Sequence, residues 1–347
     1  MKSVSSDAVV ELKTVGFALT TKCNFYCAHC ITNSSPAIND SISLNDAYIL
    51  IEQIAKESNN ICFTGGECFL RLNDLYSCIS KANQLKLNIS IVTNGFWAKN
   101  EHRAREIICE LKKLKVSGIC VSLDKFHLPF TVLDNALLIA KLCKEHNINS
   151  LVRVCSTKND SFADELINRE KHSDINFQRI RVLRMGRATN LPLSDFNFIS
   201  TLPEDCCTTV RSPIVLPNGM VQACCGPGVC FENHNPLNLG NWKEEKLSHI
   251  LRKHKTHPIV MALHNFGPKY LFEMLESEFP NSKLPKRENY TGICELCVDL
   301  CNSKDINHLM DNLFEKTDLK LKLIAGQVYQ QAFYFLSKNE YIDLPNN

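Results

Sequence analysis

Residues 15–30 read VGFALTTKCNFYCAHC, an apolar run followed directly by a loop that carries Cys23, Cys27 and Cys30. Three thiols this close together can wrap a short loop around a metal centre. A structural zinc ion requires four ligands, and His29 is the available fourth, but consecutive residues such as His29 and Cys30 seldom face one ion. A 4Fe-4S cluster held by three thiolates instead keeps one iron open for a substrate or cofactor.

The apolar run at 15–20 is the first of six, and longer segments with helical periodicity lie between them. The predicted strands are VGFALT (15–20), NICFT (60–64), NISIVT (88–93), GICVSL (118–123), SLVRVC (150–155) and FQRIRVLR (177–184). Predicted helices include residues 43–58, with Ser43 as the N-cap, 101–115 and 131–147. This alternation predicts an α/β protein with a parallel sheet, either open and doubly wound or curved into an incomplete barrel.

Polar motifs follow the first four predicted strands. The cysteine loop follows the first strand, and GGE at 65–67 ends the second. Asn94 and Gly95 end the third strand, and SLDKFH at 122–127 ends the fourth. Because the carboxyl ends of parallel strands meet at one edge of the sheet, we expect these motifs to form a single pocket there.

Length and charge exclude several classes of protein. At 347 residues and 44% hydrophobic content, the chain can bury a substantial core. The formal net charge is +2, and short basic clusters such as Lys112, Lys113 and Lys115 predict a solvated helix face rather than a nucleic-acid interface. Glu11 and Lys13 interrupt the N-terminal apolar run, and no later run could span a bilayer. We therefore expect a cytoplasmic protein that binds neither nucleic acid nor membrane.

Cysteine usage is unusually high, at 18 residues. Without an export signal, so many cysteines indicate metal binding rather than disulfides. One group is the loop at 23–30, and a second lies between residues 206 and 301. Scattered cysteines in apolar segments are predicted to be small buried hydrophobic residues: Cys62, Cys78, Cys109, Cys120, Cys143 and Cys155.

The second cysteine group can supply four thiolates. They are one of Cys206 and Cys207, then Cys224, and the pair Cys294 and Cys297. Four thiolates suffice for a closed auxiliary 4Fe-4S cluster, and the same four could hold zinc. The turn residues PNG at 217–219 predict a hairpin that leads into Cys224.

Cys225 directly follows one of these predicted ligands. Adjacent side chains of an extended strand point to opposite faces, so Cys225 would be a free thiol beside a redox centre if Cys224 is a ligand. A thiol is a good hydrogen-atom donor to a carbon radical. The alternatives are that Cys225 is a small buried residue or a further ligand.

The cysteine loop, with an aromatic ring at His29 and a GGE after the second strand, resembles the radical S-adenosylmethionine (SAM) superfamily. The resemblance implies a partial (β/α)6 TIM-like barrel in which a 4Fe-4S cluster on the loop binds SAM. Cleavage of SAM then yields a 5'-deoxyadenosyl radical that takes a hydrogen atom from the substrate. The residues implied to contact SAM are Gly65, Gly66, Glu67, Asn94, Ser122, Asp124 and Arg153, whereas Lys125 and His127 face substrate or solvent.

A cysteine-rich extension after such a core resembles the SPASM and twitch enzymes that modify peptides. It implies that Cys207, Cys224, Cys294 and Cys297 hold one auxiliary 4Fe-4S cluster. The segments FTGGECFL, TNGFW, SLDKFHLPF, NGMVQACC and ICELC sharpen the resemblance to YydG-type peptide epimerases. The family pattern has one cysteine where this chain has Cys206 and Cys207, and it has no counterpart for the extra Cys68, Cys230 and Cys301.

The resemblance implies a peptide epimerase. Such an enzyme removes the Cα hydrogen of an L-residue in a ribosomally made precursor peptide, and catalytic Cys225 returns hydrogen to the other face to leave a D-residue. One alternative is a radical SAM cyclase that forms thioether or carbon–carbon cross-links. Another is a non-catalytic iron–sulfur or zinc scaffold. The expected partners are the precursor peptide and an electron donor such as flavodoxin or ferredoxin.

The expected organisation has three parts. Residues 1–195 form the barrel, residues 196–310 form the auxiliary cluster region, and residues 311–347 contain a helix that packs back on the body. Few residues precede the first strand at Val15, so we expect the barrel, the C-terminal region or a separate protein to hold any leader.

Overall fold

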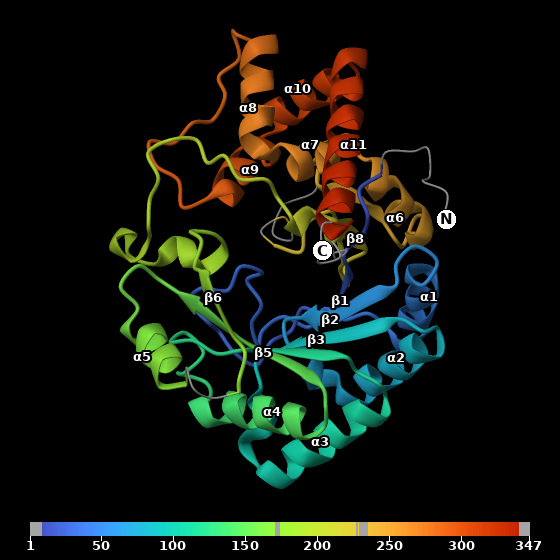
Figure 1. Ribbon diagram of the computed structural model, residues 1–347, viewed down its shortest axis with the longest axis vertical. Helices are drawn as coiled ribbons and strands as arrows, with labels where there is room; N and C mark the ends of the chain where they lie inside the picture. The colour runs from blue at the N-terminus through green and yellow to red at the C-terminus, as the bar shows by residue number, and fades with distance from the viewer. Residues whose placement is uncertain (1–8, 171–173, 227, 229–234, 340–347) are drawn as a thin grey trace, which may run out of the picture.

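A nine-stranded sheet forms the centre of the protein, in a computed structural model that describes residues 9–170, 174–226, 228 and 235–339. The strand order is β6-β5-β4-β3-β2-β1-β7-β8-β9, and β1 to β6 pair in parallel. The strands are β1 (Val15–Thr20), β2 (Asn60–Gly65), β3 (Asn88–Thr93), β4 (Gly118–Ser122), β5 (Asn149–Ser156), β6 (Phe177–Arg181), β7 (Ile214–Val215), β8 (Met220–Gln222) and β9 (Asn238–Asn241). All six predicted strands are confirmed. The sheet is curved, and β6 and β9 are its edge strands within the described ranges, so it forms a partial barrel (Figure 1).

The predicted crossover helices are present. The Ser43 hydroxyl accepts a hydrogen bond from the Asp46 N–H at 3.1 Å, which confirms this N-cap. The α-helices are α1 (Leu44–Ile54), α2 (Leu72–Gln84), α3 (Glu101–Lys113), α4 (Leu133–Glu145), α5 (Ser161–Glu170), α6 (Leu247–Thr256), α7 (Pro258–Asn265), α8 (Gly267–Glu278), α9 (Ile293–Cys301), α10 (Lys304–Phe314) and α11 (Thr317–Asn339). Helices α2 to α5 surround the outside of the barrel, and α7 to α11 gather at the opposite end of the molecule (Figure 1).

The two faces of the central strands carry different side chains. On β2 to β4, apolar residues such as Phe63, Ile91 and Val121 are fully buried in the core that also contains the crossover helices. The residues that alternate with them are small, such as Cys62 and Cys120, and they line a cavity. The inner face of the barrel is therefore hollow, whereas branched side chains usually fill a TIM barrel.

The predicted hairpin is confirmed, and it joins the barrel sheet. β7 pairs in parallel with β1, where Gly16 lies opposite Ile214. β8 then pairs antiparallel with β7, and β9 with β8. The chain leaving β8 at Gln222 enters Cys224 and Cys225, so this sheet positions the second cysteine group.

The predicted C-terminal helix is α11. Leu319 and Leu323 are buried in the main core, and the Gln327 side chain donates a hydrogen bond to the Val9 carbonyl at 2.8 Å. These residues of the helix therefore pack on the body of the protein. In the ranges described above, no helix has both the length and the apolar character that a membrane-spanning segment requires.

Candidate functional site

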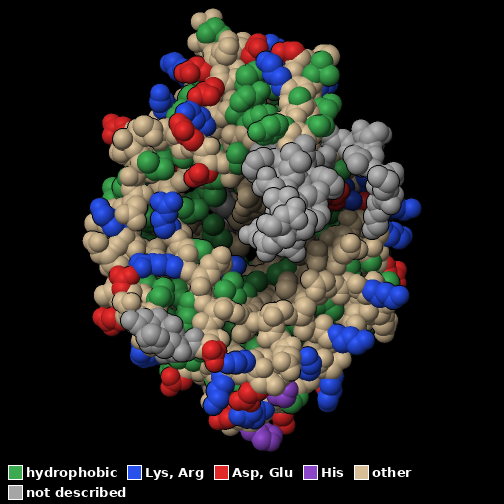
Figure 2. Space-filling model, in the orientation of Figure 1, with side chains coloured by type: hydrophobic (Ala, Val, Ile, Leu, Met, Phe, Trp, Pro, Cys, Tyr) green, Lys and Arg blue, Asp and Glu red, His purple; other side chains and the backbone are tan. Residues whose placement is uncertain are grey.

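A cavity of about 790 Å³ runs along the hollow inner face of the barrel. It is lined at the C-terminal edge of the sheet by Cys23, Cys27, Cys30, Gly65, Gly66, Asn94, Ser122, Arg153 and Cys225. At the other end it reaches Thr14, Gly118 and Asn149, near the starts of their strands. Figure 2 shows a hollow between the barrel and the C-terminal helices. The motifs predicted to meet at one edge of the sheet do form a single pocket.

Hydrogen bonds and close packing with neighbouring segments fix the backbone of the cysteine loop. The Cys23 N–H donates to the Ser35 carbonyl at 3.1 Å, and the Arg187 side chain donates to the Cys27 carbonyl at 2.9 Å. Gly186 has a φ of +54°, and a Cβ there would lie 2.5 Å from the Cys30 carbonyl oxygen. Only glycine fits this close approach.

The loop presents its sulfur atoms to hydrogen-bond donors. The Phe25 N–H lies 3.4 Å from the Cys23 sulfur, and the Asn94 side-chain amide lies 3.7 Å from it. Burial raises the pKa of the Cys23 thiol to about 12. Metal binding displaces such a proton, and the two N–H groups then stabilise the thiolate. This donor set fits a cluster ligated by three thiolates.

His29 does not act as a fourth ligand beside these cysteines. Its Nε2 lies 3.4 Å from an Asp124 carboxylate oxygen, and its ring stacks on Phe126 with centroids 4.7 Å apart. Burial lowers the pKa of His29 to about 4. The closed zinc alternative therefore lacks its ligand.

The spacing of the sulfurs also argues against zinc. Thiolates around one zinc ion lie roughly 4 Å apart, given Zn–S bonds of about 2.3 Å. Across the described ranges, the one set of three candidate ligand atoms within 4.8 Å of one another is His29, Asp124 and Cys155. Among the described residues, neither cysteine group supplies three ligand atoms within that distance of one another.

Gly65 and Gly66 line the cavity, but they are packed against protein backbone. Gly65 has a φ of +132°, and a Cβ there would lie 2.0 Å from the Thr20 carbonyl oxygen. At Gly66 the corresponding distance to the Lys22 carbonyl oxygen is 2.1 Å. The two glycines therefore allow the end of β2 to pack against the start of the cysteine loop.

The prediction for Glu67 requires a correction. We expected Glu67 to line the pocket with the two glycines, but its side chain is buried and does not line the cavity. Its carboxylate accepts hydrogen bonds from the Asn94 N–H at 2.6 Å, the Thr93 hydroxyl at 2.9 Å and the Phe69 N–H at 3.0 Å. Burial raises the pKa of Glu67 to about 7, although these bonds oppose the shift. Glu67 positions the end of β3, which carries Asn94.

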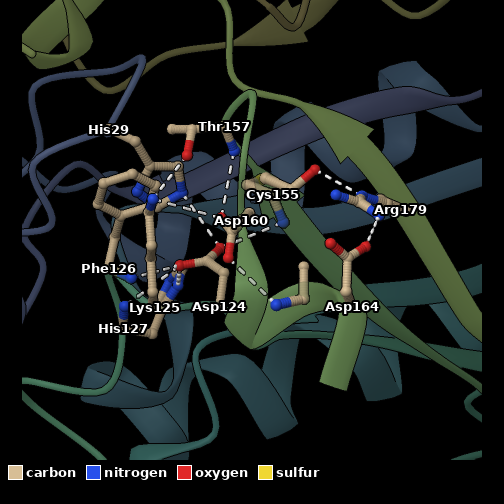
Figure 3. Close-up of polar contacts among 12 residues, drawn as sticks. His29, Asp124, Lys125, Phe126, His127, Cys155, Thr157, Asp160, Asp164 and Arg179 are labelled. Carbon is tan, nitrogen blue, oxygen red and sulfur yellow. Dashed lines mark hydrogen bonds and ion pairs between the residues drawn. The ribbon is translucent and has the colours of Figure 1, made fainter. Parts of the chain in front are cut away.

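Asp124 is also a positioning residue rather than a lining one (Figure 3). Its carboxylate accepts from the Phe126 N–H at 3.0 Å and contacts the His127 ring Nδ1 at 2.8 Å. We expected it to contact SAM, but its oxygens are taken up by these neighbours. His127 itself lines the cavity. Burial lowers its pKa, yet hydrogen bonds with Asp124 and Cys27 outweigh burial and raise the pKa to about 10.

Lys125 does not line the cavity, whereas His127 does. Its ammonium group donates to the Thr157 hydroxyl at 2.6 Å and lies 3.5 Å from Asp160. Arg153 does line the cavity, and its Nε donates to the Gln178 side chain at 3.1 Å. Arg153 is therefore placed to contact a ligand in the cavity, whereas Lys125 contacts protein side chains.

The second cysteine group converges on a smaller apolar cavity. Its lining includes Cys207, Cys224, Cys294 and Cys297. Helix α9 presents the last two, and the Gly226 N–H lies 3.2 Å from the Cys224 sulfur. Burial raises the pKa of Cys207 to about 12 and that of Cys224 to about 11. Four thiols at one enclosed, uncharged site fit a cluster with four thiolate ligands.

The remaining cysteines of this region lie elsewhere. Cys206 is exposed, and its thiol donates to the Asn265 carbonyl at 3.2 Å, so Cys207 is the member of the pair that faces the cavity. Cys301 is buried with its sulfur 3.9 Å from that of Cys297. Cys230 lies outside the described residues. The residue pattern by itself had left the choice between Cys206 and Cys207 open.

Cys225 lies between the two cavities. It lines the large cavity, while its neighbour Cys224 lines the small one. Cys225 is accessible to solvent through the cavity that it borders. Protein atoms nevertheless surround its thiol, and this burial raises the pKa of Cys225 to about 12. Cys225 is therefore protonated at neutral pH and carries an S–H hydrogen into the space that the cysteine loop also lines.

The family comparison matches the barrel. A family model described as the radical SAM superfamily matches residues 17–157. The putative peptide biosynthesis protein YydG of Bacillus subtilis (strain 168) is 23% identical over 301 residues, which are 84% of this chain and 93% of that protein. Pre-heme d1 synthase of Dinoroseobacter shibae is 27% identical over 154 residues, which are 43% of this chain and 38% of that protein.

A solved structure of native anSMEcpe with bound AdoMet and Cp18Cys peptide has a similar fold. Its TM-score is 0.51 at 15% sequence identity, and the match covers 94% of this chain and 99% of that one. The similarity extends beyond the barrel into the cysteine-rich region.

Proposed function

Residues 17–157 form a radical SAM domain, and on this premise we propose that the protein is a radical SAM epimerase that acts on a ribosomally made peptide. The observation that carries the proposal is the position of Cys225, which shares one cavity with Cys23, Cys27 and Cys30. A cross-linking enzyme needs no hydrogen donor at this place. The likeness to a peptide biosynthesis protein and to a peptide-bound structure supports a peptide substrate.

Each set of residues has a role in this proposal. Cys23, Cys27 and Cys30 would hold a 4Fe-4S cluster, and Gly65, Gly66, Asn94, Ser122 and Arg153 would surround SAM. When bound, this cluster and SAM supply a 5'-deoxyadenosyl radical that removes a Cα hydrogen atom, and an auxiliary 4Fe-4S cluster supplies a path for one electron. Glu67 and Asp124 hold the strand ends in place.

Cys225 then completes the reaction. Its S–H bond breaks as a new C–H bond forms on the peptide, which leaves a sulfur-centred radical. One electron, from a donor of the flavodoxin or ferredoxin class, and one proton restore the thiol. Cys207, Cys224, Cys294 and Cys297 would hold the auxiliary cluster next to Cys225, where it can deliver that electron.

The test is a reaction in D2O with a candidate peptide, read by mass spectrometry. We expect the wild-type enzyme to form 5'-deoxyadenosine and to install one deuterium at Cα. Cys225→Ala should still cleave SAM but install no deuterium. Cys62→Ala is the matched control because Cys62 is another thiol that lines the same cavity. If Cys62→Ala fails to install deuterium and Cys225→Ala still installs it, then Cys62 is the hydrogen donor.

Other outcomes distinguish the alternatives. A peptide that loses hydrogen without gaining deuterium, with Cys225→Ala fully active, would identify a cyclase. A protein that binds no SAM and releases no 5'-deoxyadenosine in the presence of dithionite would be a scaffold without catalytic activity.

A further inference from the structure

Strand β6 is a free edge of the sheet that borders the large cavity. It stands last in the strand order, beyond β5 (Figure 1). Ile180, Arg181 and Val182, at the end of β6 and just after it, line the cavity that also contains Cys225. Among the residues that the structure describes, no further strand pairs with this edge, and it lies beside the candidate site.

The pairing with β5 shows which backbone groups of β6 are free. The Asn176 carbonyl accepts from the Val152 N–H, and the Val182 N–H donates to the Ser156 carbonyl. Alternate residues of a parallel strand bond to a given neighbour, so 176, 178, 180 and 182 face β5. The N–H and C=O groups that point to the free side belong to Phe177, Arg179 and Arg181. In the ranges that the structure describes, no hydrogen bond uses these groups.

The side chains along this edge favour a particular kind of ligand. Ile180 is 37% exposed, so an apolar surface is available there. In the described part of the chain, no ion pair or hydrogen bond involves the Arg181 side chain, and Arg153 has only the neutral Gln178 as its side-chain partner. Asp40 is the one carboxylate among the described residues that line the cavity. The edge therefore carries uncompensated positive charge.

We propose that the free edge of β6 binds the precursor peptide as an added β-strand. The bound segment is extended and carries no net positive charge. Main-chain pairing holds a peptide by its backbone and so sets the position of its Cα atoms beside the cavity. The proposal rests on the proposed function only in taking a peptide as the substrate, and it holds for an epimerase and for a cyclase.

A competing explanation is that β6 is simply a protected edge. Natural sheets guard their edges with short strands and charged side chains to prevent aggregation, and β6 is short and carries Arg179 and Arg181. In that case the edge binds nothing. The two explanations differ in whether the free N–H groups contribute to peptide binding.

The variant Arg181→Pro tests this difference. Proline removes the free N–H of residue 181 and leaves the Val182 N–H bond to β5 in place, and edge strands tolerate proline at such positions. Arg181→Ala is the matched control, because it removes the same side chain and keeps the N–H. The probe is a phage-displayed library of random dodecapeptides, selected on the anaerobic holoenzyme and followed by affinity measurements on synthetic binders.

We expect binders without net positive charge that bind Arg181→Pro about three- to tenfold more weakly than Arg181→Ala, the effect of one hydrogen bond. Methylation of alternate peptide amides should weaken binding, while methylation of the intervening amides should not. If circular dichroism shows that Arg181→Pro does not fold, the N-methyl scan on the wild-type protein still tests whether the peptide pairs with β6.

Equal affinity for both variants, an N-methyl scan without alternation, or a library without binders would overturn the proposal. Failure of the epimerase assay with intact, β6-dependent binding would refute the chemistry and leave the edge assignment standing.

Discussion

Replacing Glu67 should destabilise the protein, because this residue holds the strand ends together. Glu67 accepts three hydrogen bonds in a buried site, two from backbone N–H groups and one from Thr93. All three partners donate, so the site accommodates a group that only accepts. In Glu67→Gln, the new amide NH2 must face at least one of these donors. In Glu67→Leu, both backbone N–H groups lose their acceptor.

The expected magnitudes follow from the number of unsatisfied groups. One buried donor without an acceptor costs about 1–3 kcal/mol, so Glu67→Gln should lose about that much stability. Glu67→Leu should lose about 2–6 kcal/mol, since it leaves two such donors. For a chain of this length, 1–3 kcal/mol corresponds to a fall in Tm of about 1–4 °C.

The assay is thermal and urea unfolding, together with SAM binding measured by calorimetry. Glu52→Gln is the matched control, because Glu52 is half exposed and forms a surface ion pair with Lys81. That control should change stability by no more than about 0.5 kcal/mol. If Glu67→Leu is as stable as Glu52→Gln while SAM binding is lost, then Glu67 contacts SAM directly and our assignment of its role is wrong.

Two further predictions concern the second cysteine group. Cys207→Ser should reduce the iron content by about four atoms per chain, which is the content of one 4Fe-4S cluster. Cys206→Ser should leave the iron content unchanged. The reverse result would show that Cys206 is the ligand. Glu295 of α9 is buried between Arg184 and Arg287, whose guanidinium nitrogens lie 2.9 Å from its carboxylate. Glu295→Ala should lower the free energy of unfolding by roughly 2 kcal/mol. This is less than the loss expected for a fully buried ion pair, because both arginines are partly exposed. Urea midpoints measured against the exposed Glu276→Ala would check this, and equal midpoints would show that Glu295 does not link α9 to the barrel.

Much of the barrel could be predicted from the sequence, because its strands are short apolar runs between amphipathic helices. The predicted strands at 15–20 and 88–93 coincide with β1 and β3, and the others agree to within a few residues. The cysteine loop could be placed at the edge of the sheet because it follows β1. Cys224, Cys294 and Cys297 were expected to converge because the resemblance implied that they bind one cluster, and all three line one cavity.

Side-chain direction was harder to predict. Glu67 and Asp124 stand beside cavity-lining residues in sequence, but each turns into the protein to satisfy backbone N–H groups. A sequence motif gives the type of a residue and its position in the chain, but it does not give the direction in which the side chain points. The union of β7 to β9 with the barrel was also missed. These strands are only two to four residues long, and their pairing depends on contacts far apart in the chain.

The position of β1 inside the sheet means that the barrel is not a module that can be cut free. β1 is covered on one side by β2 and on the other by β7, from the cysteine-rich region. All six of its residues are buried. A truncation before β7 would turn this apolar strand into a bare edge, the kind that pairs with other chains and aggregates. Truncation, domain swapping and directed evolution of this enzyme should therefore keep both regions in one chain.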